Sequence, residues 1–126
     1  MMKRQQKTAC LLLLVATVAC GGPNYIEMTK KAHLAECSNY SIGRIVNGYF
    51  ETTGWTAYHT DEDDVKRVTG SGQILVAGAY TDAELEFLYR VSTAEASMTG
   101  VRFNGQDQLR PFAEALIENM CEKARE

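Results

Sequence analysis

The sequence predicts a small domain of the α+β class, because two kinds of periodicity occupy different parts of the chain. Near residue 45 and again near the C-terminus, apolar residues recur every three or four positions, which is typical of amphipathic helices. Between these parts, apolar and polar residues alternate, which is typical of strands with one buried face. Both patterns are satisfied by a fold that consists of a helix, a four-stranded antiparallel meander and a C-terminal helix packed on one sheet face.

The helical segments that precede the strands differ in how clearly they are marked. The stretch 25–37, YIEMTKKAHLAEC, predicts a short helix without a clean apolar period. Ser41 is a suitable N-cap for a second helix, and Gly54 is the expected turn residue after it. The apolar positions of this second helix are Ile42, Ile45, Val46, Tyr49 and Phe50.

The middle of the chain predicts four strands. The first is 55–60, and the acidic stretch 61–64 is the turn that follows it. The second is 65–78, with a bend or bulge at Gly70 and Gly72.

Residues 83–91 and 96–104 supply the other two strands. The side chains predicted to face inward from 83–91 are Ala83, Leu85, Phe87, Tyr89 and Val91. The corresponding set in 96–104 is Ser97, Thr99, Val101 and Phe103. Asn104-Gly105 then predicts a tight turn.

The last helix is the most clearly marked element. It is predicted over 109–124, with Asn104 or Asp107 as its cap and Pro111 in its first turn. Its apolar face comprises Leu109, Phe112, Ala113, Leu116, Ile117, Met120 and Cys121.

The N-terminus predicts export from the cytoplasm. Three basic residues precede an apolar run over 9–19, which has the form of a signal peptide and is too short for a bilayer span of about 20 residues. We therefore divide the chain into a signal peptide (1–19), an anchor cysteine with a flexible tether (20–25) and a single α+β domain (26–126). Ordinary cleavage after Ala19 would leave Cys20 as a plain thiol.

Val18-Ala19-Cys20 followed by Gly21 resembles the lipobox of bacterial lipoproteins, although Thr17 stands where that motif usually has Leu. The resemblance implies a lipid anchor, including palmitate, on Cys20. Gly21 in place of Asp implies sorting to the outer membrane, with the domain facing the periplasm.

Cysteine counting supports the same interpretation. Cys10 lies in the signal, so three cysteines remain in the mature chain, and one must be unpaired in an oxidising compartment. A lipid on Cys20 removes the odd thiol, and Cys37 and Cys121 are then left as a natural disulfide pair.

The domain also resembles a widespread group of small, largely uncharacterised bacterial lipoproteins and secreted domains. The resemblance is carried by YSIGRIVNGYF, Trp55, VKRVTGSG and GVRFNGQDQL, and it spans most of 38–121. It implies the α+β fold and supplies no catalytic residue.

Charge narrows the range of partners. The precursor has 13 basic and 16 acidic residues; removal of Lys3, Arg4 and Lys7 leaves 10 against 16, a net charge of −6. An acidic domain repels phosphate backbones, so we expect no nucleic-acid partner. The expected partners are a membrane, through the anchor, and a protein of the envelope.

Few residues suggest a chemical site. Asp61, Asp63 and Asp64 are weak candidates for a cation, because 61–64 lacks the Gly and Glu positions of a calcium loop. Gly70-Ser71-Gly72 lacks the third glycine of a phosphate loop. We expect no catalytic residue, no metal and no cofactor.

Aromatic residues suggest a binding surface instead. A sheet covered by helices on one side leaves its other face open, and Tyr58, Tyr80 and Tyr89 are the residues predicted on a binding face. The expected function is that of a non-enzymatic, membrane-tethered binding or accessory module of the envelope. The alternative is a small displayed inhibitor or exclusion factor that blocks an incoming enzyme, phage or conjugation apparatus.

Overall fold

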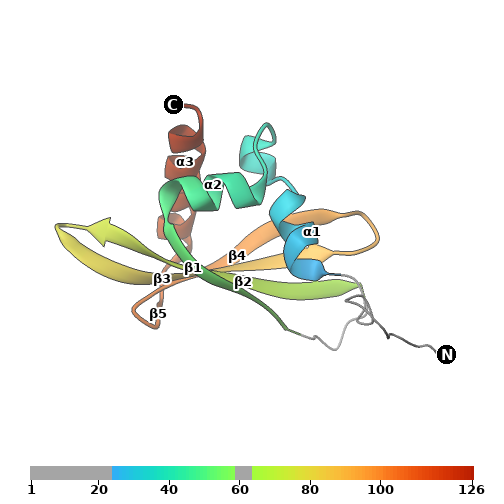
Figure 1. The fold of residues 1–126 in the computed structure, drawn as a ribbon, viewed down its shortest axis with the longest axis horizontal. Helices are drawn as coiled ribbons and strands as arrows, with labels where there is room; N and C mark the ends of the chain where they lie inside the picture. The colour runs from blue at the N-terminus through green and yellow to red at the C-terminus, as the bar shows by residue number, and fades with distance from the viewer. Residues whose placement is uncertain (1–23, 59–63) are drawn as a thin grey trace, which may run out of the picture.

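The protein is an α+β domain in which one layer of helices covers one face of a sheet. The computed structural model describes residues 24–58 and 64–126. The described elements are α1 (Tyr25–Lys31), a 3₁₀ turn η1 (Ala35–Cys37), α2 (Ile42–Tyr49), β1 (Glu51–Tyr58), β2 (Val65–Val76), β3 (Ala79–Arg90), β4 (Glu95–Phe103), β5 (Gln106–Asp107) and α3 (Arg110–Ala124). The strands form an antiparallel meander in the order β1-β2-β3-β4-β5, and the helices lie on one side of it (Figure 1). The predicted class is confirmed, with the short β5 as a fifth strand.

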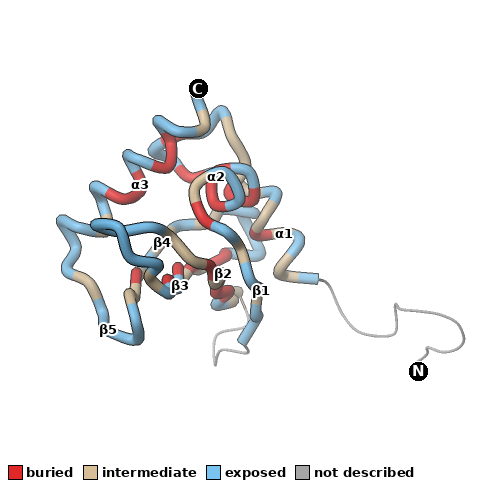
Figure 2. The backbone as a smooth tube through the Cα atoms, turned by 60° about the vertical axis from the view of Figure 1, so that its left-hand side comes forward, coloured by how far each residue is buried: buried red, intermediate tan, exposed pale blue. Residues whose placement is uncertain are grey.

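The core lies between the two layers, where the tube through the backbone is most deeply buried (Figure 2). It combines apolar residues of the helices with those on one face of the sheet. Its fully buried members include Leu34, Ile42, Ile45, Leu85, Phe87, Val101, Met120 and Cys121.

The predicted helix over 25–37 is wrong in its second half. Helix α1 begins at Tyr25, where the Asn24 side chain caps it, and ends at Lys31. Its first turn therefore uses the last residue of the predicted tether. The chain then turns back, because His33 forms an isolated bridge with Ser41 and the Ile42 amide donates to the Ala32 carbonyl.

Helix α2 follows its prediction closely. The Ser41 hydroxyl accepts a hydrogen bond from the Arg44 amide at 3.2 Å, and Ile42, Ile45 and Val46 are buried. The predicted turn at Gly54 is wrong. Strand β1 begins at Glu51, directly after α2, and Gly54 lies inside it.

The irregularities of the sheet lie in β1 and β4 rather than at the glycines of β2. Strands β2 and β3 pair without a break from Val65 to Val76, so the predicted bulge at Gly70 and Gly72 is wrong. The β1–β2 register shifts between Thr52 and Gly54 instead. Gly70 serves close packing, because the ring of Trp55 lies over it.

Strand β3 keeps its predicted alternation up to Tyr89, and Ala83, Leu85, Phe87 and Tyr89 are buried. Val91 lies beyond the strand and is 37% exposed, which corrects its inward assignment.

In β4 the pairing with β3 skips Thr99. A bulge reverses the alternation, so Ala96 and Met98 pack against the core in place of the predicted Ser97 and Thr99. Val101 and Phe103, beyond the bulge, remain on the core side.

The predicted turn at Asn104-Gly105 is present, with φ of 51° and 80°. The predicted caps of the last helix are wrong: Leu109 is the N-cap residue and makes no side-chain cap hydrogen bond. The Asn104 side chain accepts from the Asp82 amide, and Asp107 pairs with Arg102. Leu109 is 79% and Phe112 41% exposed, so the buried face of α3 starts at Leu116.

The Cys37–Cys121 disulfide joins η1 to α3 and closes a separation of 84 residues. The cysteine count predicted this pair. Both cysteines belong to the buried core cluster. The bond therefore fixes the C-terminal half of α3 against the segment that leads into α2.

We predict that Gly70→Ala lowers the free energy of unfolding by about 1–3 kcal/mol. An added Cβ would lie 3.0–3.2 Å from three atoms of the Trp55 ring. That ring cannot easily yield, because it stacks on Phe87 at 6.1 Å and carries the Lys30 ammonium at 5.7 Å. Urea denaturation measures the effect.

Gly48→Ala is the control for that substitution. An added Cβ at Gly48 meets nothing within 4 Å, and Gly48 lies within α2. This change should raise stability by up to about 1 kcal/mol. A Gly70→Ala protein as stable as the wild type would contradict the close-packing role of Gly70.

Candidate functional site

Among the described residues, several exposed apolar side chains lie at the end of the β2–β3 hairpin, residues 74–81, which we call the arm. Pairing of β1 with β2 ends at Glu51 and Gln73, and pairing of β4 with β3 ends at Ala83 and Phe103. Among the described strands, residues 74–81 therefore pair only with one another. The arm extends beyond the rest of the sheet as a two-stranded ribbon (Figure 1).

Local sequence accounts for the shape of the arm. Ala77 and Gly78 form its turn with φ of 50° and 84°, the left-handed conformation that two-residue hairpins require. At its base, the Asn104 amide donates to the Asp82 carbonyl at 2.8 Å and the Gln73 side chain donates to the Asp82 carboxylate at 2.9 Å. These contacts hold the ribbon where the neighbouring strands end.

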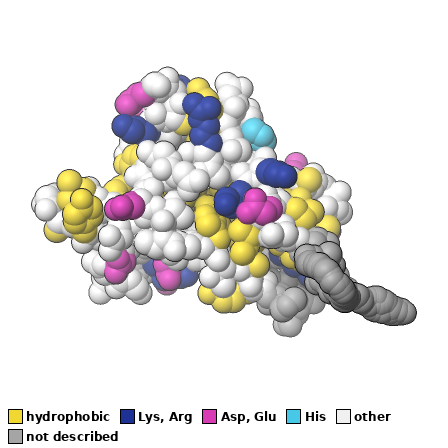
Figure 3. Space-filling model, in the orientation of Figure 1, with side chains coloured by type: hydrophobic (Ala, Val, Ile, Leu, Met, Phe, Trp, Pro, Cys, Tyr) yellow, Lys and Arg dark blue, Asp and Glu magenta, His cyan; other side chains and the backbone are white. Residues whose placement is uncertain are grey.

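The arm is apolar on both faces. On the open face of the sheet, Leu75 is 59% and Tyr80 71% exposed, and they oppose each other across the hairpin. On the helix-covered face, Val76 is 40% exposed. Hydrophobic side chains gather at the free end of the arm in the space-filling view (Figure 3). The sequence ILVAGAYT over 74–81 contains no charged residue.

A groove lies between the arm and α3. It has a volume of about 330 Å³. Its walls include Ile74, Val76, Phe103, Phe112, Ala115 and Leu116, and the described residues that line it are uncharged. The rings of Phe103 and Phe112, which both line the groove, meet edge to face at 5.2 Å. The surface offered here is concave and apolar.

The open face of the sheet, in contrast, is polar and paired within itself. Arg67 contacts Glu86 at 3.1 Å, and Arg102 contacts Glu84 at 2.9 Å. The hydrogen bond to Glu84 raises the pKa of Arg102 above its ordinary value. Since these charges neutralise one another, this face is a poor platform for an apolar partner.

The three tyrosines predicted on one binding face lie in different parts of the fold. Tyr58 is 49% exposed and pairs with Arg67, whereas Tyr80 lies on the arm, eight residues further along β2 by register. That spacing corresponds to roughly 26 Å along the strand. Tyr89 is only 3% exposed and faces the helices, so its assignment to the binding face is corrected. Of the three, Tyr80 alone belongs to the arm.

Asp61 and Asp63 lie outside the described residues, and Asp64 has a structural role. Its carboxylate accepts hydrogen bonds from the Ser92 amide and hydroxyl, each at 2.8 Å, and from Arg90 at 3.2 Å. Asp64 thus joins the start of β2 to the β3–β4 turn. Within residues 24–58 and 64–126, no group of three or more His, Cys, Asp or Glu side chains is arranged to hold a metal ion.

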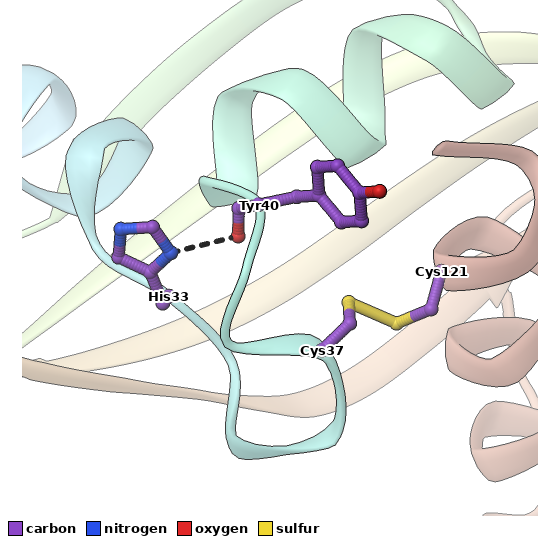
Figure 4. Close-up of a disulfide and its surroundings, with 4 residues drawn as sticks. All are labelled: His33, Cys37, Tyr40 and Cys121. Atoms are coloured by element: carbon purple, nitrogen blue, oxygen red, sulfur yellow. Dashed lines mark hydrogen bonds between the residues drawn. A yellow bond between two sulfur atoms is a disulfide. The ribbon is translucent and has the colours of Figure 1, made fainter. Parts of the chain in front are cut away.

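A second groove, of about 490 Å³, lies between η1 and the end of the β3–β4 hairpin and is lined by His33, Arg90 and Glu95 among others. The His33 Nδ1 donates to the Tyr40 carbonyl at 2.9 Å, beside the disulfide (Figure 4). Arg90 is already bound to Asp64. The imidazole of His33 and the guanidinium of Arg90 are therefore both used in structural contacts.

Cys20 lies outside the described residues, as does the predicted signal peptide. None of the described helices is both long and apolar enough to cross a membrane.

We predict that Asp64→Asn destabilises the fold at pH 7 and that this effect shrinks below about pH 4. The hydrogen bond from the Ser92 hydroxyl lowers the pKa of Asp64 below its ordinary 3.8. Desolvation opposes this shift, whereas the Ser92 amide and Arg90 add to it. A lowered pKa in the folded state stabilises the fold above 3.8, and this stabilisation is lost progressively as the pH falls from that value through the lower pKa of the folded state.

Urea denaturation of both proteins at pH 7 and pH 3 tests this pH dependence. Glu95→Gln, which changes an exposed carboxylate near the same turn, is the control and should have little effect at either pH. An Asp64→Asn effect of equal size at both pH values would refute the role of the carboxylate charge.

Comparisons of the chain with protein-family models, with curated proteins and with solved structures found no match. The function must therefore be inferred from the chemistry and geometry of the chain itself.

Proposed function

We propose that this protein is a non-enzymatic lipoprotein of the bacterial cell envelope, anchored by a lipid on Cys20, and that its arm docks a protein partner. The observation that carries the proposal is the arm: an uncharged, two-stranded apolar ribbon that extends past its neighbouring strands. A two-stranded hairpin is marginally stable in water, and apolar surface of this kind is typical of interaction sites.

The composition of the arm supports binding to a protein. Tyr80 is a large, exposed aromatic residue with Leu75 opposite it, and exposed tyrosines commonly serve as anchors at protein interfaces. The adjacent groove adds the aromatic ring of Phe112. Arm and groove together offer a projection and a concavity at the same end of the molecule.

The resemblance of Val18-Ala19-Cys20 to a lipobox supports the lipid anchor, and Gly21 directly after the cysteine supports an outer-membrane location facing the periplasm. The Cys37–Cys121 disulfide adds support in two ways. It fits an oxidising compartment, and it uses the two other cysteines of the mature chain, which leaves Cys20 without a partner among them.

Non-enzymatic function is supported by the state of the second groove. The His33 Nδ1 donates its hydrogen bond to the backbone carbonyl of Tyr40, so this ring nitrogen is used in a structural contact. Arg90 serves the contact with Asp64. A catalytic assignment would need an acid or base directed at a reacting atom.

One observation favours the alternative function of an inhibitor or exclusion factor. The arm ends in the tight Ala77-Gly78 turn and has no charge, so it is narrow enough to enter the cleft of another protein. This alternative function predicts that the arm makes its contact only when an incoming phage, enzyme or conjugation apparatus is present. An accessory module would contact a protein of its own envelope at all times.

Replacement of the anchor residue tests the location. In Cys20→Ser the acceptor sulfur is absent, so we expect the precursor to accumulate uncleaved or, if ordinary cleavage follows Ala19, to appear free in the periplasm. Membrane fractionation and mass spectrometry of the N-terminal peptide measure this. An unmodified wild-type Cys20 thiol on protein that washes off membranes would overturn the lipoprotein assignment.

Photo-cross-linking tests the arm. With benzoylphenylalanine at position 80 of the full-length protein in its own envelope, we expect a protein adduct; at position 58, another exposed tyrosine far from the arm, we expect none. Val76→Lys should abolish the adduct. Val91→Lys is the matched control, since Val91 is equally exposed at the other end of β3, and should preserve it. Equal yields from positions 80 and 58 would contradict the proposal.

A further inference from the structure

We infer that the protein docked by the arm is a second copy of this chain, whose arm enters the groove between arm and α3 while its own groove receives the first arm. This inference rests on the proposed function and names its partner. It depends on three features: the shape of the groove, the distribution of charge and the unpaired strand edges.

The groove and the arm are both uncharged and mainly apolar. The groove is open, uncharged and lined by Val76, Phe112 and Leu116, so its occupant must present a slender apolar surface without charge. The arm, with Leu75 and Tyr80 exposed, is such an element. It forms a wall of its own groove and therefore cannot fill it within one molecule. In a two-fold symmetric dimer, each copy inserts its arm into the groove of the other. Both arms and both grooves are then occupied, and no further copy can add.

Charge favours this contact over others between identical copies. With a net charge of −6, two copies of the mature chain repel each other overall. Residues 74–81 and the described lining of the groove carry no charge, so two copies approach at this end at the least electrostatic cost. The carboxylates at the base of the arm, on Glu51 and Asp82, disfavour an anionic lipid surface as the occupant.

The edges of the arm add a third reason. Both outer edges of the ribbon lack a neighbouring strand among the described residues, and the arm has no Pro, Lys or Arg that would protect such an edge. An arm from a second copy can supply backbone partners as well as apolar contact.

The expected association is weak. Each copy would contribute the eight arm residues and a few groove residues. This is roughly half of the 20–30 residues that each partner contributes to a standard interface. Confinement of both copies to one membrane raises their effective concentration and compensates for low affinity. The dimer should therefore be observed on the membrane rather than in dilute solution.

Two differently tagged copies of the full-length protein, co-expressed in the envelope, test the inference. With benzoylphenylalanine at position 80 of one copy, we expect an adduct containing both tags, with the cross-linked peptide mapping to the α3 segment around Phe112. Val76→Lys in both copies should lower its yield roughly tenfold or more, because two ammonium groups would enter an apolar contact. Val91→Lys in both copies should leave the yield unchanged.

A charge-pairing experiment separates direct contact from misfolding. Ala115 is exposed and lines the groove. Ala115→Glu in both copies should also lower the yield, whereas one Val76→Lys copy with one Ala115→Glu copy should restore it, because opposite charges then meet across the interface. Thermal melts of each variant confirm folding.

The outcomes distinguish the inference from the proposed function. An adduct that lacks the second tag but still disappears with Val76→Lys would overturn self-association and retain a foreign protein partner. An adduct with lipid alone would overturn the inference and replace the protein partner by a membrane. No adduct from position 80 would overturn both.

Discussion

The Cys37–Cys121 disulfide is the constraint on which the geometry of the candidate site depends. Helix α3 follows β5 with no side-chain cap, and its first turn carries the exposed residues Leu109 and Phe112. Its fully buried residues begin at Leu116, after the partly buried Ala113, and Cys121 lies among them. Closure of a separation of 84 residues is worth about 4 kcal/mol in the chain-entropy model, a large fraction of the stability of a domain this small. Since α3 is one wall of the groove, the bond that fixes α3 also fixes the groove.

The parts of the fold that were predictable from the sequence are those determined by neighbouring residues. Ser41 caps α2 through its own side chain, Asn104-Gly105 adopts the turn that its two residues favour, and β3 alternates because one of its faces is buried. The bulges at Thr53 and Thr99 were not predictable, because a bulge depends on the register of the partner strand. The cap of α3 was mispredicted for a similar reason: Asn104 uses its side chain on Asp82, which is distant in sequence.

The candidate site shows the same division. The alternation of side chains along β3 places Tyr89 with Leu85 and Phe87 on the helix side, and in the structure all three are buried. The arm itself was not predicted, because its extent depends on where the neighbouring strands β1 and β4 end. Both ends are set by tertiary structure rather than by neighbouring residues. One signal in the sequence includes it: the chain carries no charge from Val68 to Thr81, a run that contains the arm. Such a run in a buried strand would look the same, so the sequence alone could not separate a core strand from an exposed arm.

The positions of the arm and of α1 restrict how an anchored pair would sit on a membrane. The arm and the start of α1 lie at opposite ends of the molecule (Figure 1). Three residues lie between Cys20 and Asn24, so the four chain steps reach at most roughly 14 Å, whereas the twelve residues of β2 extend over roughly 40 Å. Two copies joined by their arms would therefore carry their anchors at the two outer ends. Both anchors can enter one bilayer only if the two-fold axis is perpendicular to it, with the sheets lying along the surface. The proposed lipid on Cys20 and the inferred dimer through the arms are thus geometrically compatible, and together they would hold the paired arms midway between two points of attachment.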